Sequence, residues 1–223
     1  MTKSKESDKV SIVLLVVYSA VFYLVWTVFH FFVEPFISKI PSEAAAALLS
    51  DGLIKNLIWT LPAVILIWKN SDKLSVGLKD LFAVNKASVK YLWLFPAFAA
   101  YIIVGILIHG GTIGISSDFG FPDIITVIFV GITEEIVFRG WLLNATLDRH
   151  EDAAIAINSI MFLAIHFPRW ICEGVFIGNF ESFGFVSIIA LSVIFSILFA
   201  KTKSLFLPVT LHMFWDLLMF MLY

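Results

Sequence analysis

Long runs of apolar residues separated by short polar stretches dominate the chain. A membrane-spanning helix needs about 20 predominantly apolar residues. The pattern predicts about seven such helices in a single membrane domain, with connections at 69–90 and 168–182. The predicted helices cover 10–33, 52–68, 91–109, 122–147, 153–167, 183–200 and 205–223.

The composition agrees with a membrane protein. Hydrophobic residues make up 60% of the chain and charged residues 14%, whereas soluble domains have about 45–50% and about 25%. This excludes a soluble enzyme, a disordered regulator and a nucleic-acid-binding module, and the lipid bilayer becomes the expected partner. A net charge of −2 carries no signal for a nucleic-acid partner. The single cysteine, Cys172, excludes an intramolecular disulfide and a cysteine-cluster metal site.

The distribution of positive charge predicts the orientation. Lysine and arginine gather on the cytoplasmic side of membrane proteins. With seven alternating spans and a cytoplasmic N-terminus, the outer segments carry only Lys39, Arg169 and Lys55, the last at a membrane edge. The inner segments carry Lys3, Lys5, Lys9, Lys69, Lys73, Lys79, Lys86, Lys90, Arg149, Lys201 and Lys203.

The predicted helix 122–147 carries Glu134, Glu135 and Arg139 in its middle. A charge near the bilayer centre costs about 2.5–3.5 kcal/mol on insertion scales. Glu135 and Arg139 are four residues apart and can neutralise each other on one helix face. The helical period turns Glu134 about 100° away, so Glu134 has no partner on its own helix.

Two other predicted helices carry ionisable groups. Asn158, Phe162 and His166 form one stripe, in which we expect Asn158 to bond a neighbouring helix. His212 and Asp216 share a face of the last helix, whereas His30 and His109 are expected to be interfacial. These faces predict one polar site in the bundle interior, built from Glu134, His166, His212 and Asp216.

Such a cluster can hydrolyse a bond in two ways. A carboxylate and an imidazole can activate a water molecule, while a second imidazole stabilises the oxyanion. Alternatively, two imidazoles and a carboxylate form the ligand set of a catalytic divalent metal such as zinc. The candidate ligands are then Glu134, His166 and His212. The residues leave both routes open.

Three short motifs resemble those of the CPBP intramembrane proteases, the CAAX-prenyl-protease-type and bacteriocin-processing enzymes also called the Abi family. Residues 134–140, Glu-Glu-Ile-Val-Phe-Arg-Gly, are similar to its Glu-Glu-x-x-x-Arg motif. Residues 162–166, Phe-Leu-Ala-Ile-His, resemble Phe-x-x-x-His, and residues 212–216, His-Met-Phe-Trp-Asp, resemble His-x-x-x-Asn/Asp. The resemblance runs from about 122 to 223, and residues 1–121 match only as generic N-terminal membrane helices.

The resemblance implies a role for each motif residue. Glu134 activates the water and His166 assists. His212 and Asp216 line the oxyanion side, although many members have Asn where this chain has Asp216. The resemblance assigns structural support of the site to Glu135, Arg139 and Phe162.

The function implied is that of an intramembrane endopeptidase. Its substrate is a membrane-associated or lipid-modified peptide or protein, presented from the membrane. The short, loop-poor chain is typical of prokaryotic members, so we expect the bacterial plasma membrane. The alternatives are a non-catalytic bacteriocin-immunity or scaffold protein of the same fold, and a proton-coupled transporter. The transporter is disfavoured because the chain shows no paired half-repeats.

Overall fold

The computed structural model describes residues 9–182 and 184–222, and within these ranges all regular structure is helical. Five helical stretches there are long and apolar enough to cross a membrane. The fold is therefore the all-α polytopic bundle expected from the hydrophobic pattern. The five stretches are Ile12–Ile37, Glu43–Lys69, Lys86–Ile108, Glu151–Cys172 and Gly184–Thr202.

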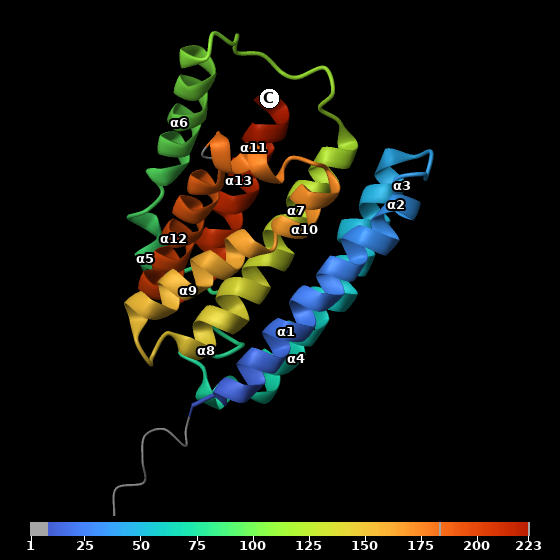
Figure 1. The fold of residues 1–223 in the computed structure, drawn as a ribbon. Coiled ribbons are helices and arrows are strands. Elements are labelled where there is room, and N and C mark those ends of the chain that lie inside the picture. Colours follow the sequence, from blue (N-terminus) through green and yellow to red (C-terminus); the bar gives the residue numbers. More distant parts are fainter. Residues whose placement is uncertain (1–8, 183, 223) are drawn as a thin grey trace, which may run out of the picture.

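The N-terminal part of the bundle is a long helical pair on one flank (Figure 1). The first stretch comprises α1 (Ile12–Val28), a π-helical segment (Phe29–Val33) and α2 (Glu34–Ile37). The second comprises α3 (Glu43–Ala47), two π-helical segments (Leu48–Ile54 and Asn56–Thr60) and α4 (Leu61–Lys69).

The second helix begins earlier than predicted. We expected residues 52–68, but the helix starts at Glu43, where the Ser42 side chain caps it by accepting a hydrogen bond from Ala45 N. This correction moves Lys55 from a membrane edge to the middle of the stretch, where it is buried. Asp51, one turn earlier, forms an ion pair with Lys55 and makes this position tolerable.

The charged helix runs through the centre of the bundle. It consists of α7 (Phe121–Glu135), a π-helical segment (Ile136–Leu143) and α8 (Asn144–Thr146). Every residue of the segment Ile136–Leu143 is buried. The Asn144 side chain binds both the N–H and the C=O of Val76, at 2.8 and 2.9 Å, and so fastens the connection after α4 to this central helix.

The fifth predicted helix extends further than its apolar run. It comprises α9 (Glu151–Ala164) and α10 (Phe167–Cys172), and Pro168 is tolerated because it lies in the first turn of α10. His166 therefore sits inside a longer helical stretch, although the predicted boundary placed it at a helix end. Asn158 donates a hydrogen bond to Ser196 Oγ of the next long helix, as its place on the stripe indicated.

The remaining helices complete the bundle. They are α5 (Lys86–Val89), α6 (Leu94–Ile108), α11 (Phe176–Glu181), α12 (Gly184–Thr202) and α13 (Phe206–Leu222). In Figure 1, α13 and α7 lie in the middle, with α6 on the flank opposite to α1 and α4. The α1 helix is fastened to α9 and the turn after it, because Tyr23 and Trp26 donate hydrogen bonds to the carbonyls of Met161 and Ile165.

The close approach of α7 and α13 depends on a glycine. A Cβ atom on Gly131 would lie 2.6 Å from Cγ and 3.4 Å from the backbone N of Met213. Small residues at such crossings let membrane helices pack closely. The position of α13, and with it His212 and Asp216, therefore depends on the missing side chain of Gly131.

We expect Gly131→Leu to lower the stability of the bundle by about 1–3 kcal/mol, because overpacking forces the two helices apart. The measurement is the thermal unfolding midpoint of the detergent-solubilised protein. Gly178→Leu is the matched control, because a Cβ at Gly178 meets no atom within 4 Å. Equal midpoints for the two variants would show that the crossing tolerates a side chain.

Candidate active site

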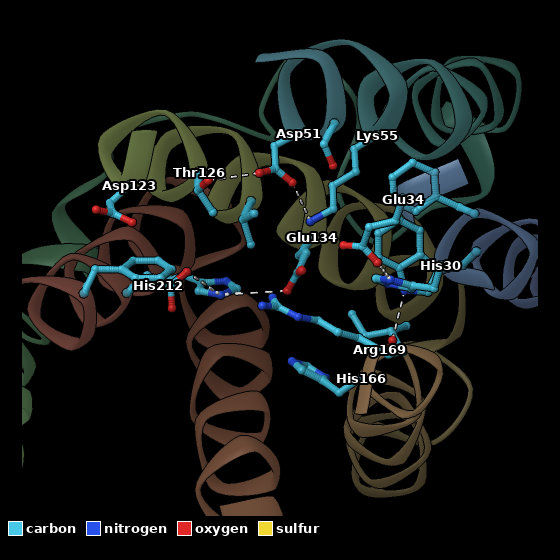
Figure 2. A pocket seen from close by; sticks show the side chains of 17 residues that line it. His30, Glu34, Asp51, Lys55, Asp123, Thr126, Glu134, His166, Arg169 and His212 are labelled. Atoms are coloured by element: carbon cyan, nitrogen blue, oxygen red, sulfur yellow. Dashed lines mark hydrogen bonds and ion pairs between the residues drawn. The ribbon is translucent and has the colours of Figure 1, made fainter. Parts of the chain in front are cut away.

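A cavity of about 400 Å³ lies within the bundle, and charged side chains from both halves of the chain line it (Figure 2). The four residues that the sequence placed in one cluster, Glu134, His166, His212 and Asp216, all line this cavity. The other polar and charged residues of its wall are His30, Glu34, Ser50, Asp51, Lys55, Asp123, Thr126 and Arg169.

The α7 helix presents one stripe to the cavity. Thr126, Val130 and Glu134 follow one another at intervals of four residues and all line the cavity, as the helical period requires. Glu134 is 7% exposed, whereas the next residue, Glu135, is turned away from the cavity and fully buried. The two adjacent glutamates therefore differ in environment: Glu134 faces the cavity, whereas Glu135 faces the packed interior.

Glu135 and Arg139 form a fully buried ion pair, with Arg139 Nη1 donating to Glu135 Oε1 at 2.9 Å. The other end of the guanidinium donates to the carbonyl and hydroxyl oxygens of Ser192 on α12, at 3.0 and 2.7 Å. Phe162 packs its ring 4.6 Å from the guanidinium carbon, a favourable cation–π arrangement. The motif arginine therefore joins the central helix to α12 and α9.

His212 lies between three carboxylates. Its Nδ1 is 2.9 Å from Glu135 Oε1, and its Nε2 is 3.5 Å from Asp216 Oδ2 and 3.9 Å from Glu134 Oε2. Its ring stacks on Phe195, with centroids 5.3 Å apart. Sequence spacing paired Glu135 with Arg139 and missed its contact with His212, because the two residues are 77 positions apart.

His166 approaches the cavity from the turn between α9 and α10. Its Nδ1 lies 3.1 Å from the carbonyl oxygen of Phe162, one turn earlier. A neutral imidazole that donates Nδ1–H to this carbonyl has Nε2 free as an acceptor. The rings of Phe162 and Trp170 lie next to the imidazole, with centroids 5.6 and 5.7 Å away. The geometry thus fixes the ring while leaving one nitrogen for chemistry.

The sequence-based expectation for His30 is wrong. We expected an interfacial group, but His30 is 3% exposed, lines the cavity and forms a hydrogen bond with Glu34. The Asp51–Lys55 ion pair lies on the same wall. Both pairs carry a signal that could have revealed them. Each joins opposite charges at i and i+4 inside an apolar run, the pattern that identified Glu135 and Arg139.

His109, the other histidine expected at an interface, caps the end of α6 and is exposed. Cys172, the single cysteine, is exposed at the end of α10 and does not line the cavity. Neither residue belongs to the candidate site.

The candidate metal ligands, Glu134, His166 and His212, do not come together as a group in this structure. Within residues 9–182 and 184–222, no three His, Cys, Asp or Glu side chains lie close enough together to hold a metal ion. Glu134 and His212 approach each other to 3.9 Å, but they do not form a ligand group with His166.

The bundle, its buried charges and its polar cavity define a class, the integral membrane proteins with a polar cavity inside a helical bundle. Residues 119–218 match the family model of the type II CAAX prenyl endopeptidases, Rce1-like. This match confirms the resemblance inferred from the three motifs, all of which lie within the matched segment. No curated protein and no solved structure matches the chain.

We expect Arg139→Met to destabilise the folded protein by about 3–5 kcal/mol, because it leaves Glu135 as an unpaired buried charge. The measurements are the yield of membrane-inserted protein and its thermal midpoint. Lys201→Met is the control, since it breaks the exposed Glu151–Lys201 pair at 3.4 Å and should cost about 0–1 kcal/mol. Similar losses in the two variants would contradict the structural importance of the buried pair.

Proposed function

We propose that this protein is an intramembrane endopeptidase that cleaves a membrane-associated or lipid-modified peptide or protein, with a water molecule activated by Glu134 and His166. The observation that carries this proposal is that residues of all three motifs line one cavity: Glu134, His166, His212 and Asp216. A buried carboxylate that shares a cavity with a free imidazole nitrogen can take a proton from water.

The proposed reaction is a single hydrolysis. Glu134 takes a proton from water, with His166 Nε2 accepting the second hydrogen bond, and the water oxygen bonds to the peptide carbonyl carbon. The carbonyl oxygen becomes an oxyanion, which receives a hydrogen bond from His212 Nε2–H. This donation requires the doubly protonated imidazolium, since Nδ1–H is already donated to Glu135. Collapse of this intermediate breaks the C–N bond, and the proton held by Glu134 passes to the departing amine. The products are a carboxylic acid and an amine.

The surroundings of His212 support its assignment to the oxyanion. Its Nδ1 is held by Glu135, so Nε2 is the nitrogen that faces the cavity. Asp216, 3.5 Å from Nε2, accepts hydrogen bonds when ionised and cannot donate one as an asparagine would. We therefore propose that Asp216 orients His212 rather than bonding the oxyanion itself.

The proposed orientation follows from charge, and the proposed bacterial membrane follows from the short, loop-poor chain. We propose the plasma membrane of a bacterium, with the N-terminus in the cytoplasm, since the excess of lysine on the predicted inner segments supports this orientation. Lys3 and Lys5, which contribute to that excess, lie outside the described residues.

We expect Glu134→Gln and His166→Ala each to reduce cleavage by at least 10²–10⁴-fold while the protein stays folded. The measurement compares the membrane peptidomes of host cells that carry the wild type or a variant. Glu181→Gln, an exposed change of the same chemistry on α11, should leave every cleavage product in place. If no product depends on Glu134, the non-catalytic scaffold function is favoured instead.

A chelator titration separates the two routes to an activated water. We propose direct activation, because the candidate ligands do not form a three-residue group within the described ranges. Purified protein in phospholipid vesicles should keep its full rate on the peptide found by the peptidome comparison after exhaustive chelation. If the rate is lost and returns on adding zinc, a bound metal activates the water instead.

A further inference from the structure

The Asp51–Lys55 pair lies outside the three motifs and outside residues 119–218, which match the family. Lys55 is 7% exposed and Asp51 9% exposed. An ammonium group inside an apolar helix is expensive, and such groups in membrane proteins generally have a function. The pair therefore calls for an explanation beyond helix packing.

Contacts fix the Lys55 ammonium on several sides. Asp51 Oδ1 lies 3.0 Å from its Nζ, and Asp51 Oδ2 accepts a 3.0 Å hydrogen bond from Thr126 Oγ1 on α7. The rings of Trp26 and Trp59 lie 5.2 and 5.6 Å from Nζ, within the range of cation–π attraction. Few rotamers of Lys55 satisfy all these contacts at once.

This arrangement directs Lys55 along the α7 stripe toward Glu134. Thr126, which holds Asp51, lies two helical turns before Glu134 on the same face. Lys55 lies one turn after Asp51, and Figure 2 shows its ammonium group between Asp51 and Glu134 in that view. Lys55 and Glu134 carry opposite charges and line the same cavity, although they form no direct ion pair.

The other cations near Glu134 are engaged elsewhere. Arg139 is bound by Glu135 and Ser192. His212 Nε2 is closer to Asp216 than to Glu134, at 3.5 against 3.9 Å. Arg169, although on the cavity wall, is exposed and pairs with Glu173 at 2.7 Å. An ammonium group has three N–H donors and Asp51 uses one, so Lys55 keeps N–H groups that can turn toward Glu134.

We propose that Lys55 is a positioning residue for hydrolysis, whose clamped ammonium group aims the Glu134 carboxylate at the attacking water. This inference rests on the proposed function and extends it, because it makes the N-terminal helices part of the active site. Lys55 acts through Glu134 and does not contact the substrate. Its loss should therefore lower kcat without raising KM.

The test uses the full-length protein in phospholipid vesicles and, as its probe, a synthetic peptide spanning a Glu134-dependent cleavage site from the peptidome comparison. We expect Lys55→Met to lower kcat by about a hundredfold, the typical effect of a misplaced reacting group, with KM unchanged. Lys55→Arg should recover most of this loss because it keeps the charge. Lys90→Met, which removes an exposed lysine beside Tyr91, should match the wild type.

A structural role for Lys55 gives a different result. Lys55→Met would then lower the folded fraction and the thermal midpoint, while kcat per folded molecule stayed at the wild-type value, and the proposal would be overturned. Thr126→Val gives an answer even if Lys55→Met does not fold. It removes the hydroxyl that anchors Asp51 and should lower kcat about fivefold, the worth of one hydrogen bond. An unchanged kcat in folded Thr126→Val would also overturn the proposal.

The test separates failure of this inference from failure of the proposed function. If the wild type yields no product that Glu134→Gln abolishes, the proposed function is wrong and the role of Lys55 is overturned with it. If the wild type cleaves the probe and folded Lys55→Met cleaves it equally fast, only the role of Lys55 is wrong.

Discussion

The buried ion pair between Glu135 and Arg139 fixes the helices that carry Glu134, His212 and Asp216. Both side chains are fully shielded, so each would be a costly isolated charge without the other. The pair also makes contacts beyond its own helix. Arg139 binds Ser192 on α12, and Glu135 binds His212 on α13. One local interaction thus sets the relation of three helices and orients the imidazole that faces Glu134.

Ion pairs of the same spacing also occur in the N-terminal helices that line the cavity. His30–Glu34 and Asp51–Lys55 are i, i+4 pairs inside apolar stretches, like Glu135–Arg139. One member of each pair lies in a π-helical segment: His30 in Phe29–Val33, Asp51 in Leu48–Ile54 and Arg139 in Ile136–Leu143. Such segments are rare and frequently occur at functional sites. The helices outside the family match therefore complete the polar wall of the cavity.

The sequence predicted the class of fold and the residues that line the cavity more accurately than it predicted the ends of the helices. Apolar runs identified the long helices, and helical periodicity placed Glu134, His166, His212 and Asp216 on faces that line one cavity. Helix ends were less accurate, because capping by Ser42 extends one helix beyond its apolar run and α10 continues another beyond His166. Because the helix begins at Glu43, Lys55 lies buried in its middle and not at the end where the sequence placed it.

By itself, the sequence determined a membrane bundle, the Glu135–Arg139 pairing and the three motifs, because these depend on hydropathy and on spacings within one helix. Only the tertiary structure decided that Glu135 also holds His212 and that Thr126 holds Asp51. These contacts join residues 77 and 75 positions apart. They depend on how each helix is rotated and how closely it packs against its neighbour, and helical periodicity in a single sequence carries no information on either.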